Sequence, residues 1–241
     1  RGMVFEKFSS RENDIVTGII QRMENKNVYI DLGKAEAILT PNEQIPGEIY
    51  QYHDRMKTYI VEVKKTSKGP QIMVSRTHPG LLKRLFELEV PEIHDGLVEI
   101  KSVAREPGMR SKISVYTKDE NIDPVGACVG HKGMRVQTIV NELRGEKIDI
   151  VKYSSEPDQY VANALSPAKV VSTEVLEEEK ICRVIVPDYQ LSLAIGKEGQ
   201  NARLAAKLTG WKIDIKSESQ AAEEAEQGAQ EVGVAYEADE D

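Results

Sequence analysis

The sequence predicts a multidomain protein in which an all-β barrel is followed by two α+β domains. Two observations lead to this fold class. Residues 11–76 contain five short runs rich in Val, Ile and Tyr, separated by turn-forming residues. After residue 79 the same order of helical and extended segments occurs twice, and each copy contains a Gly-x-x-Gly segment. A chain of 241 residues has room for two or three domains of this size.

Alternating hydrophobicity predicts the strands of the barrel. Val28, Ile30 and Leu32 fall on one face of an extended segment, whereas Tyr29 and Asp31 fall on the other. The five predicted strands cover residues 15–20, 28–32, 37–39, 56–63 and 71–74. Short strands spaced in this way are typical of a small barrel of the OB-fold class.

The repeat that follows is the most informative feature of the sequence. The first copy predicts a helix, two strands, two helices around the Gly-x-x-Gly segment and a final strand, over residues 81–86, 97–103, 112–117, 125–129, 136–143 and 147–151. The second copy has the same order, over residues 160–165, 169–175, 181–186, 189–195, 202–208 and 211–216. The two Gly-x-x-Gly segments begin 66 residues apart. The segments Leu143–Ile150 and Leu208–Ile215 agree at six of eight positions, which chance does not explain.

A helix, a tight glycine loop and a second helix together form a phosphate-contacting device. Glycines let the loop backbone approach a partner closely, and the following helix offers free N–H groups at its positive end. KH domains use this arrangement to clamp the backbone of about four nucleotides. We therefore predict two KH domains of the type II, prokaryotic arrangement, in which a helix and two strands precede the loop. The predicted RNA-binding residues are Gly130, His131, Lys132, Gly133 and Arg135 in the first copy, and Gly196, Lys197, Glu198, Gly199, Gln200, Asn201 and Arg203 in the second.

The barrel offers a second set of candidate RNA contacts. An outward Tyr29 can stack on a base, and nearby cations can meet phosphate groups. The candidate cations are Arg22, Lys26, Lys57 and Arg76. The alternative for Tyr29 is an ordinary solvated position on a strand.

The charge of the chain is uneven. Its formal net charge is −8, but residues 218–241 contain nine acidic residues and no Lys or Arg. Without this segment 31 acidic residues stand against 32 Lys and Arg, so the body does not repel phosphate overall. Composition predicts a disordered acidic tail. The alternative is an inhibitory segment that mimics RNA on a basic groove.

Other functional classes find little support. No apolar run approaches the roughly 20 residues of a membrane span, and no signal segment opens the chain. Cys128 and Cys182 lie in apolar surroundings, which indicates reduced core residues in a cytoplasmic protein. The four His are scattered, and no nucleophile elbow, P-loop or zinc-protease motif occurs, so we expect no enzyme, metal or cofactor. The alternatives left open are the RNA-binding module of a ribonuclease and a protein-interaction scaffold.

Several segments resemble one known family. They are Glu89–Ile93, Val103–Gly108, Ile122–Gly130, Glu146–Val151 and Ala194–Asn201. From about residue 1 to residue 217 the chain resembles the RNA-binding portion of the NusA family of bacterial transcription elongation, termination and antitermination factors. The resemblance implies an S-one type of OB domain before the two KH domains.

The resemblance also implies partners. These are single-stranded nascent RNA, RNA polymerase and other elongation factors, bound by a monomer that contacts no membrane. We expect that the family's N-terminal polymerase-binding domain has no counterpart in these 241 residues, and that its C-terminal acidic repeat domains are absent too. The predicted organisation is a linker-helix remnant over residues 1–10, the barrel over 11–78, the first KH domain over 79–152, the second over 153–217 and the tail over 218–241.

Overall fold

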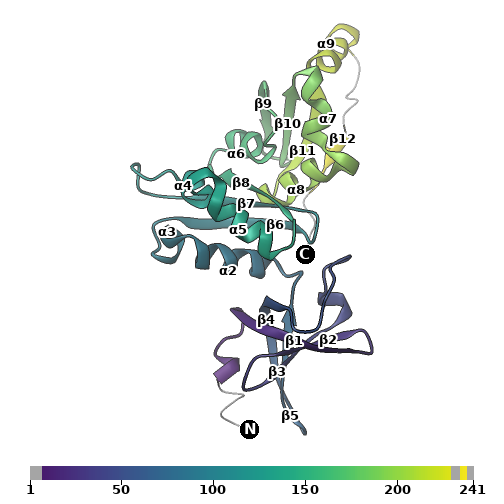
Figure 1. The fold of residues 1–241 in the computed structure, drawn as a ribbon. Coiled ribbons are helices and arrows are strands. Elements are labelled where there is room, and N and C mark those ends of the chain that lie inside the picture. Colours follow the sequence, from purple (N-terminus) through teal and green to yellow (C-terminus); the bar gives the residue numbers. More distant parts are fainter. Residues whose placement is uncertain (1–6, 229–233, 238–241) are drawn as a thin grey trace. The chain divides into compact units, whose positions relative to one another are not determined.

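The structure is a computed structural model that describes residues 7–228 and 234–237. The chain divides into two compact units. The first contains residues 1–95, 107–110 and 129–147, and the second contains residues 96–106, 111–128 and 148–241. Each unit is described by itself below, with the element labels of Figure 1.

Five strands of the first unit pair in a ring, as the sequence predicts (Figure 1). They are β1 (Ile15–Glu24), β2 (Asn27–Asp31), β3 (Glu36–Leu39), β4 (Arg55–Thr66) and β5 (Gly69–Ser75), with a short 3-10 turn over Pro41–Glu43. β1 pairs with β2 and β4, β2 with β3, and β5 with both β3 and β4. Val28 and Ile30 are fully buried, while Tyr29 is only partly buried, so the predicted alternation is confirmed.

The segment before the barrel contributes to its core. Residues 7–9 are helical, and the side chain of Phe8 is 3% exposed among the buried residues of the barrel. The predicted linker remnant is therefore partly a packed element of the barrel; residues 1–6 lie outside the described part of the chain.

The first unit also contains helices of the first repeat copy. They are α2 (Pro79–Glu89), α3 (Pro91–His94) and α5 (Met134–Glu142), the last preceded by a 3-10 turn over His131–Gly133. The ring nitrogen Nδ1 of His78 accepts the N–H of Gly80 and caps α2. The buried face of α2 consists of Leu81, Leu82, Leu85 and Phe86, and α2 contacts α3 and α5. The short helix α3 was not predicted.

The second unit contains two sheets. The first sheet has the order β6 (Glu99–Glu106), β7 (Arg110–Tyr116) and β8 (Lys147–Lys152), and α4 (Pro124–Val129) lies between β7 and the first loop in sequence. The second sheet contains β9 (Ser172–Leu176), β10 (Ile181–Val186) and β11 (Lys212–Ser217). β9 runs antiparallel to β10, and β11 runs parallel to β10. Two consecutive parallel strands need a long connection between them. The segment from residue 187 to residue 211, which contains the second loop, connects β10 to β11.

Three helices form the core with the second sheet. They are α6 (Pro157–Ala164), α7 (Leu191–Ile195) and α8 (Gln200–Thr209), with 3-10 turns over Asp188–Gln190 and Lys197–Gly199. Figure 1 shows α7 and α8 alongside β10 and β11. Buried Ile213 and Ile215 of β11 alternate with Asp214 and Lys216, which point to the other face.

The acidic tail is not structureless, and that prediction is wrong for most of it. Residues Glu218–Gln227 form the helix α9, and Val234–Tyr236 form the strand β12. Ser217 begins α9 with a reciprocal capping box to Gln220, which stabilises a helix by about 1 kcal/mol. Glu224 of α9 pairs with Lys216 at 2.7 Å. Acidic composition alone cannot reveal the Ser217 cap or the ion pair of Glu224 with Lys216, 8 residues upstream. Residues 229–233 and 238–241 lie outside the described part of the chain.

Strands of the first copy pack directly on the second copy within the second unit. The ammonium group of buried Lys112 on β7 pairs with Asp149 at 2.9 Å and donates to the carbonyl of Ser166 at 2.8 Å. The hydroxyl of Tyr160 on α6 hydrogen-bonds to Ser114 Oγ at 2.8 Å. These buried polar contacts tie the strands of one copy to the helices of the next.

Candidate nucleic-acid interface

The two Gly-x-x-Gly loops have the same backbone conformation. Gly130 has φ 78° and ψ 175°, and Gly196 has φ 81° and ψ 167°. Gly133 and Gly199 are both left-handed, with φ 74° and 76°. In each loop the last glycine N–H donates to the carbonyl of the first at 3.1 Å. These positive φ values explain why both ends of the loop are glycine.

A residue other than glycine also adopts the left-handed conformation in each loop. Lys132 has φ 54° and ψ 27°, and Glu198 has φ 56° and ψ 25°. Both side chains are exposed. A lysine and a glutamate therefore occupy equivalent positions, which gives the two loops different charge on the same backbone.

Each loop leads straight into a helix without a side-chain cap. Met134 begins α5 after Gly133, and Gln200 begins α8 after Gly199. Among the described residues, no side chain caps either helix N-terminus. The N–H of Met134 donates to the carbonyl of His131, and the N–H of Gln200 donates to the carbonyl of Lys197. The positive end of each helix still lies directly beside its loop, where it favours an anion.

The first loop presents its predicted cations to solvent. His131 and Lys132 are exposed, and Gly130 and Gly133 are partly exposed. Arg135, one residue into α5, is partly buried and pairs with Glu92 of α3 at 2.8 Å. Arg135 therefore connects the helix after the loop to α3 and presents less free charge than the sequence suggests.

The second loop is more engaged with the rest of its domain. Lys197 and Glu198 are exposed, but Gly199 is buried. Arg203 pairs with Glu106 of β6 at 2.8 Å and donates to the carbonyl of Glu198 at 3.0 Å. The Nε2 atom of Gln200 is buried and has no hydrogen-bond partner among the described residues.

Asn201 is buried rather than exposed beside the loop, which contradicts its prediction as an RNA contact. Its side chain is 0% exposed, and Nδ2 donates to the carbonyls of Leu165 and Ala194 at 3.0 and 2.9 Å. A Cβ added at Gly196 would lie 2.7 Å from the backbone N of Asn201. Asn201 therefore joins α6, α7 and α8, and Gly196 is needed for their close approach.

The prediction that Arg76 contacts RNA is also wrong, because its side chain is 0% exposed and cannot meet phosphate. Nε and Nη2 donate to the two carboxylate oxygens of Glu48 at 3.0 and 2.7 Å. Nη1 donates to Glu142 Oε1 at 3.2 Å and to the carbonyl of Lys57 at 2.8 Å. Burial lowers the pKa of Arg76, but the hydrogen bonds and charge of Glu48 outweigh this and raise it, so the guanidinium stays charged. The sequence alone gave no indication that Arg76, which follows the last predicted strand of the barrel, is buried.

The other barrel candidates lie on its surface. The guanidinium of Arg22 lies 4.1 Å from the ring centroid of Tyr29 and pairs with Glu36 at 2.8 Å. One face of Tyr29 is therefore in contact with a cation already. Lys26 is exposed in the turn between β1 and β2, and Lys57 is partly buried on β4. Their contact with RNA stays a prediction.

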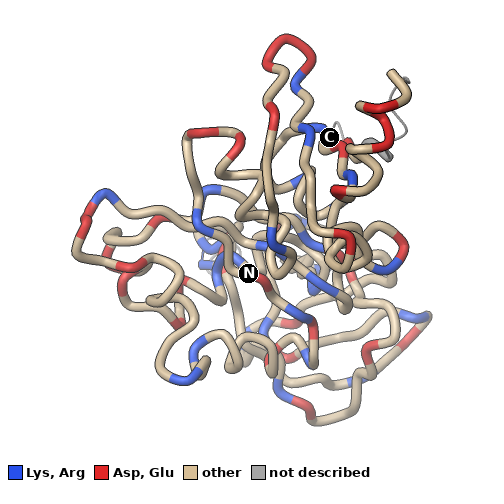
Figure 2. The backbone as a smooth tube through the Cα atoms, turned by 90° about the horizontal axis from the view of Figure 1, so that it is seen from above, with Lys and Arg blue, Asp and Glu red and all other residues tan. Residues whose placement is uncertain are grey.

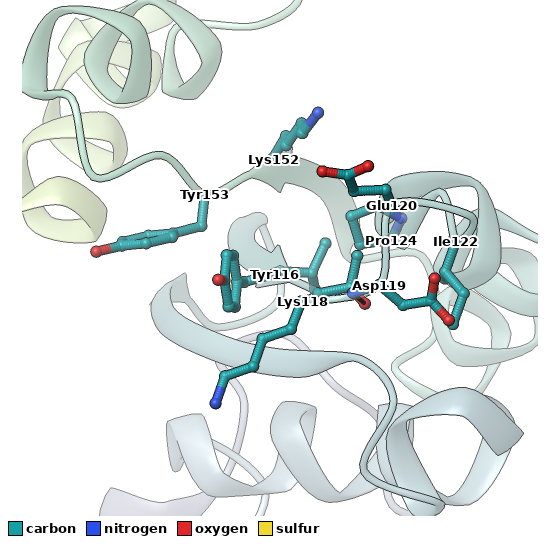
Figure 3. A pocket seen from close by; sticks show the side chains of 10 residues that line it. Tyr116, Lys118, Asp119, Glu120, Ile122, Pro124, Lys152 and Tyr153 are labelled. Atoms are coloured by element: carbon teal, nitrogen blue, oxygen red, sulfur yellow. Dashed lines mark hydrogen bonds between the residues drawn. The ribbon is translucent and has the colours of Figure 1, made fainter.

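A pocket in the second unit was not predicted (Figure 3). It has a volume of about 320 Å³ and lies between the ends of β7 and β8, the following loop and the start of α4. Tyr116 and Tyr153 meet edge to face at 5.8 Å, and the Lys101 ammonium lies 5.0 and 5.2 Å from their centroids. Lys118 and Asp119 line it together, so its charge is mixed.

Charge of both signs is spread over the described chain, and neither sign dominates the body (Figure 2). Figure 2 shows Lys and Arg interspersed with Asp and Glu along the backbone. Among residues 7–228 and 234–237, no group of three or more His, Cys, Asp or Glu could hold a metal ion. No helix of the described part is long and apolar enough to cross a membrane. Cys128 and Cys182 are buried, and burial raises the pKa of the Cys182 thiol to about 11.

Three domain families match successive parts of the chain. The S1 RNA binding domain matches residues 9–75, the NusA-like first KH domain matches residues 76–153, and the NusA-like second KH domain matches residues 157–223. These are RNA-binding types of domain, in agreement with the prediction of an RNA-binding protein rather than an enzyme.

Curated relatives match across all three domains. The chain is 70% identical over 223 residues to the transcription termination/antitermination protein NusA of Halalkalibacterium halodurans, which covers 92% of this chain and 58% of that protein. It is 70% identical to the protein of the same name from Bacillus subtilis, with 92% of this chain and 60% of that protein covered. For the Thermus thermophilus protein the identity is 49%, and 88% of this chain and 55% of that protein are covered. The chain thus spans less than two thirds of these relatives, and with its S1 domain and two NusA-type KH domains in one order it belongs to the NusA family.

Proposed function

We propose that the chain binds single-stranded nascent RNA through its two Gly-x-x-Gly loops and modulates pausing, termination and antitermination by RNA polymerase. The observation that carries this proposal is the matching backbone of the two loops, each of which leads directly into the N-terminus of a helix. The names of the relatives, all transcription termination/antitermination proteins, support the role in transcription.

The proposal includes the finer predictions. We assign the barrel to the OB class, which the ring of five strands supports. We assign both KH domains to the type II arrangement, which is supported by a helix and two strands before each loop. RNA polymerase and other elongation factors as partners, a monomeric state and a cytoplasmic location belong to the same proposal, as do the domain boundaries after residues 78, 152 and 217.

A salt titration tests the proposal. If RNA neutralises about three to five cations, the logarithm of the binding constant should fall with the logarithm of salt by about 0.7 per contact. Fluorescence anisotropy with a short single-stranded RNA at several salt concentrations measures this slope. Duplex RNA of the same sequence should bind more weakly, because KH domains read unpaired bases. A flat salt dependence would favour the protein-interaction scaffold instead.

A second test concerns the tandem arrangement of the KH domains. The buried contacts of Lys112 and Tyr160 tie strands of the first copy to the second copy within the second unit. A single RNA that engages one loop would meet the other at high effective concentration. RNA of about ten nucleotides should therefore bind much more tightly than RNA of about four, the length one KH domain clamps.

Inserting a flexible Gly-Ser segment after Ser154 should reduce the advantage of the longer RNA and leave the affinity for the shorter RNA unchanged. Anisotropy titrations with both lengths give the ratio of affinities. An unchanged ratio would mean that the two domains bind independently.

A further inference from the structure

The outer edge of the second KH sheet is occupied by the chain's own C-terminal strand. β12 runs antiparallel to β11, with Ile213 opposite Tyr236, Asp214 opposite Ala235 and Ile215 opposite Val234 in backbone register. Addition of an extended segment to a sheet edge is a common mode of peptide recognition, in which main-chain hydrogen bonds supply affinity and alternate side chains supply specificity. The β11 edge therefore has the form of a filled peptide site.

Tyr236 places its ring on the second Gly-x-x-Gly loop. A Cβ built at Gly199 would lie 2.9 Å from Tyr236 Cε1 and 3.5 Å from its hydroxyl. The ring thus fills the space that the missing side chain leaves open. The equivalent Gly133 in the first loop provides an internal comparison, because a Cβ there would have no described atom within 4 Å. Two loops with the same backbone differ in that one is covered and one is open.

Two further contacts hold the segment in place. Tyr236 packs against the buried core of the second KH domain, and β12 contacts α8, the helix that follows the loop. Burial raises the pKa of the Tyr236 phenol, and the charge of Arg203 partly offsets this. The carboxylate of Glu237 pairs with Lys212 of β11 at 2.9 Å. The ring of Tyr236 therefore occupies this side of the loop, and the carboxylate of Glu237 fastens the end of the segment to β11.

We propose that the β11 edge and the second loop form one site for an extended peptide that ends in an aromatic and an acidic residue, and that Val234–Glu237 occupies this site and excludes RNA from the second loop. The exclusion rests on the proposed function of the loop. A phosphate can approach the backbone at Gly199 only if Tyr236 leaves. RNA therefore binds the first loop freely and the second loop only after β12 is released.

Point variants of the full chain test this exclusion. In a background with His131→Asp and Lys132→Asp, RNA binding depends on the second loop. Tyr236→Ala should raise RNA affinity in this background about five- to tenfold, as expected if β12 is docked in about 80–90% of molecules. Tyr236→Phe keeps the ring and should have little effect. Glu226→Gln removes one charge from an exposed position of α9 and controls for the acidity of the tail.

Two further measurements separate the parts of the proposal. Hydrogen exchange of the β11 amides should become faster in Tyr236→Ala, and in the unsubstituted chain on addition of RNA. A synthetic peptide of residues 232–240 should compete with RNA for the Tyr236→Ala variant.

The outcomes distinguish this proposal from the proposed function. Equal RNA affinity with and without Tyr236, or unchanged β11 exchange, overturns the exclusion while RNA binding itself stands. If no variant binds RNA, the proposed function and the exclusion fail together, and the exchange data alone decide whether the peptide site exists.

Discussion

Replacing Glu48 with Ala is expected to lower the free energy of unfolding of the barrel by about 3 kcal/mol, the lower end of the range for breaking a buried ion pair. Glu48 is 2% exposed at its side chain and accepts two hydrogen bonds from fully buried Arg76. Without Glu48 the guanidinium keeps, within the described part of the chain, the Glu142 carboxylate and two carbonyl groups as hydrogen-bond partners. A buried charge with incomplete pairing is costly because the protein interior solvates it poorly.

Native-state hydrogen exchange of the β4 and β5 amides measures this loss in the full chain. Glu36→Ala is the matched control, because it removes a carboxylate that binds Arg22 through two hydrogen bonds on the exterior of the same barrel. Exposed pairs of this kind contribute at most about 1 kcal/mol. The unfolding transition of Trp211, the single Trp of the chain, should not shift, since it lies in the second unit. Equal effects of the two substitutions would contradict a structural role for Arg76.

The double substitution His131→Asp with Lys132→Asp is expected to weaken RNA binding at least tenfold, or by about 1.4 kcal/mol. It places two carboxylates at exposed positions where phosphate must approach the open first loop. The loop backbone should persist, because Asp is among the residues that tolerate the left-handed conformation of Lys132. Anisotropy titration measures the affinity, and circular dichroism confirms that the fold is retained.

Lys180→Asp is the control for a general effect of charge. Lys180 is also exposed and left-handed, with φ 53°, but it lies in the turn between β9 and β10. Its substitution should change RNA affinity much less. The corresponding change in the second loop, Lys197→Asp with Glu198→Asp, should show its full effect in the Tyr236→Ala variant, where the loop is uncovered. If the first-loop variant binds RNA as tightly as the unsubstituted chain, the loop is not the RNA site.

Local pattern was enough to predict the barrel strands and the repeat. Alternation around Val28 and Ile30 correctly gave the buried face of β2, because strand periodicity depends only on neighbouring residues. The glycines of the two loops gave the position of a backbone turn, because positive φ strongly favours glycine. Both predictions depend only on residues that are close together in the sequence.

Contacts between distant residues were not predictable in this way. Buried Arg76 hydrogen-bonds to Glu142, 66 positions further along the chain. Buried Asn201 hydrogen-bonds to the carbonyl of Leu165, 36 positions before it. In the sequence each has the appearance of an ordinary surface polar residue. The tail was misjudged for the same reason, since β12 pairs with β11, which lies earlier in the chain. Whether these residues are buried or paired depends on partners that are distant in the sequence, and residue type alone does not reveal those partners.

The matching loops have a consequence for how duplicated modules can diverge. The third position of the loop is Lys132 in one copy and Glu198 in the other, and the φ and ψ values of these two residues agree within 2°. The glycines at both ends of the loop have the same conformation in the two copies. Substitution at this position therefore alters the electrostatic preference of one copy without a cost in backbone geometry. Two copies of a duplicated module can therefore diverge in charge by a single substitution while the shape of the loop is kept.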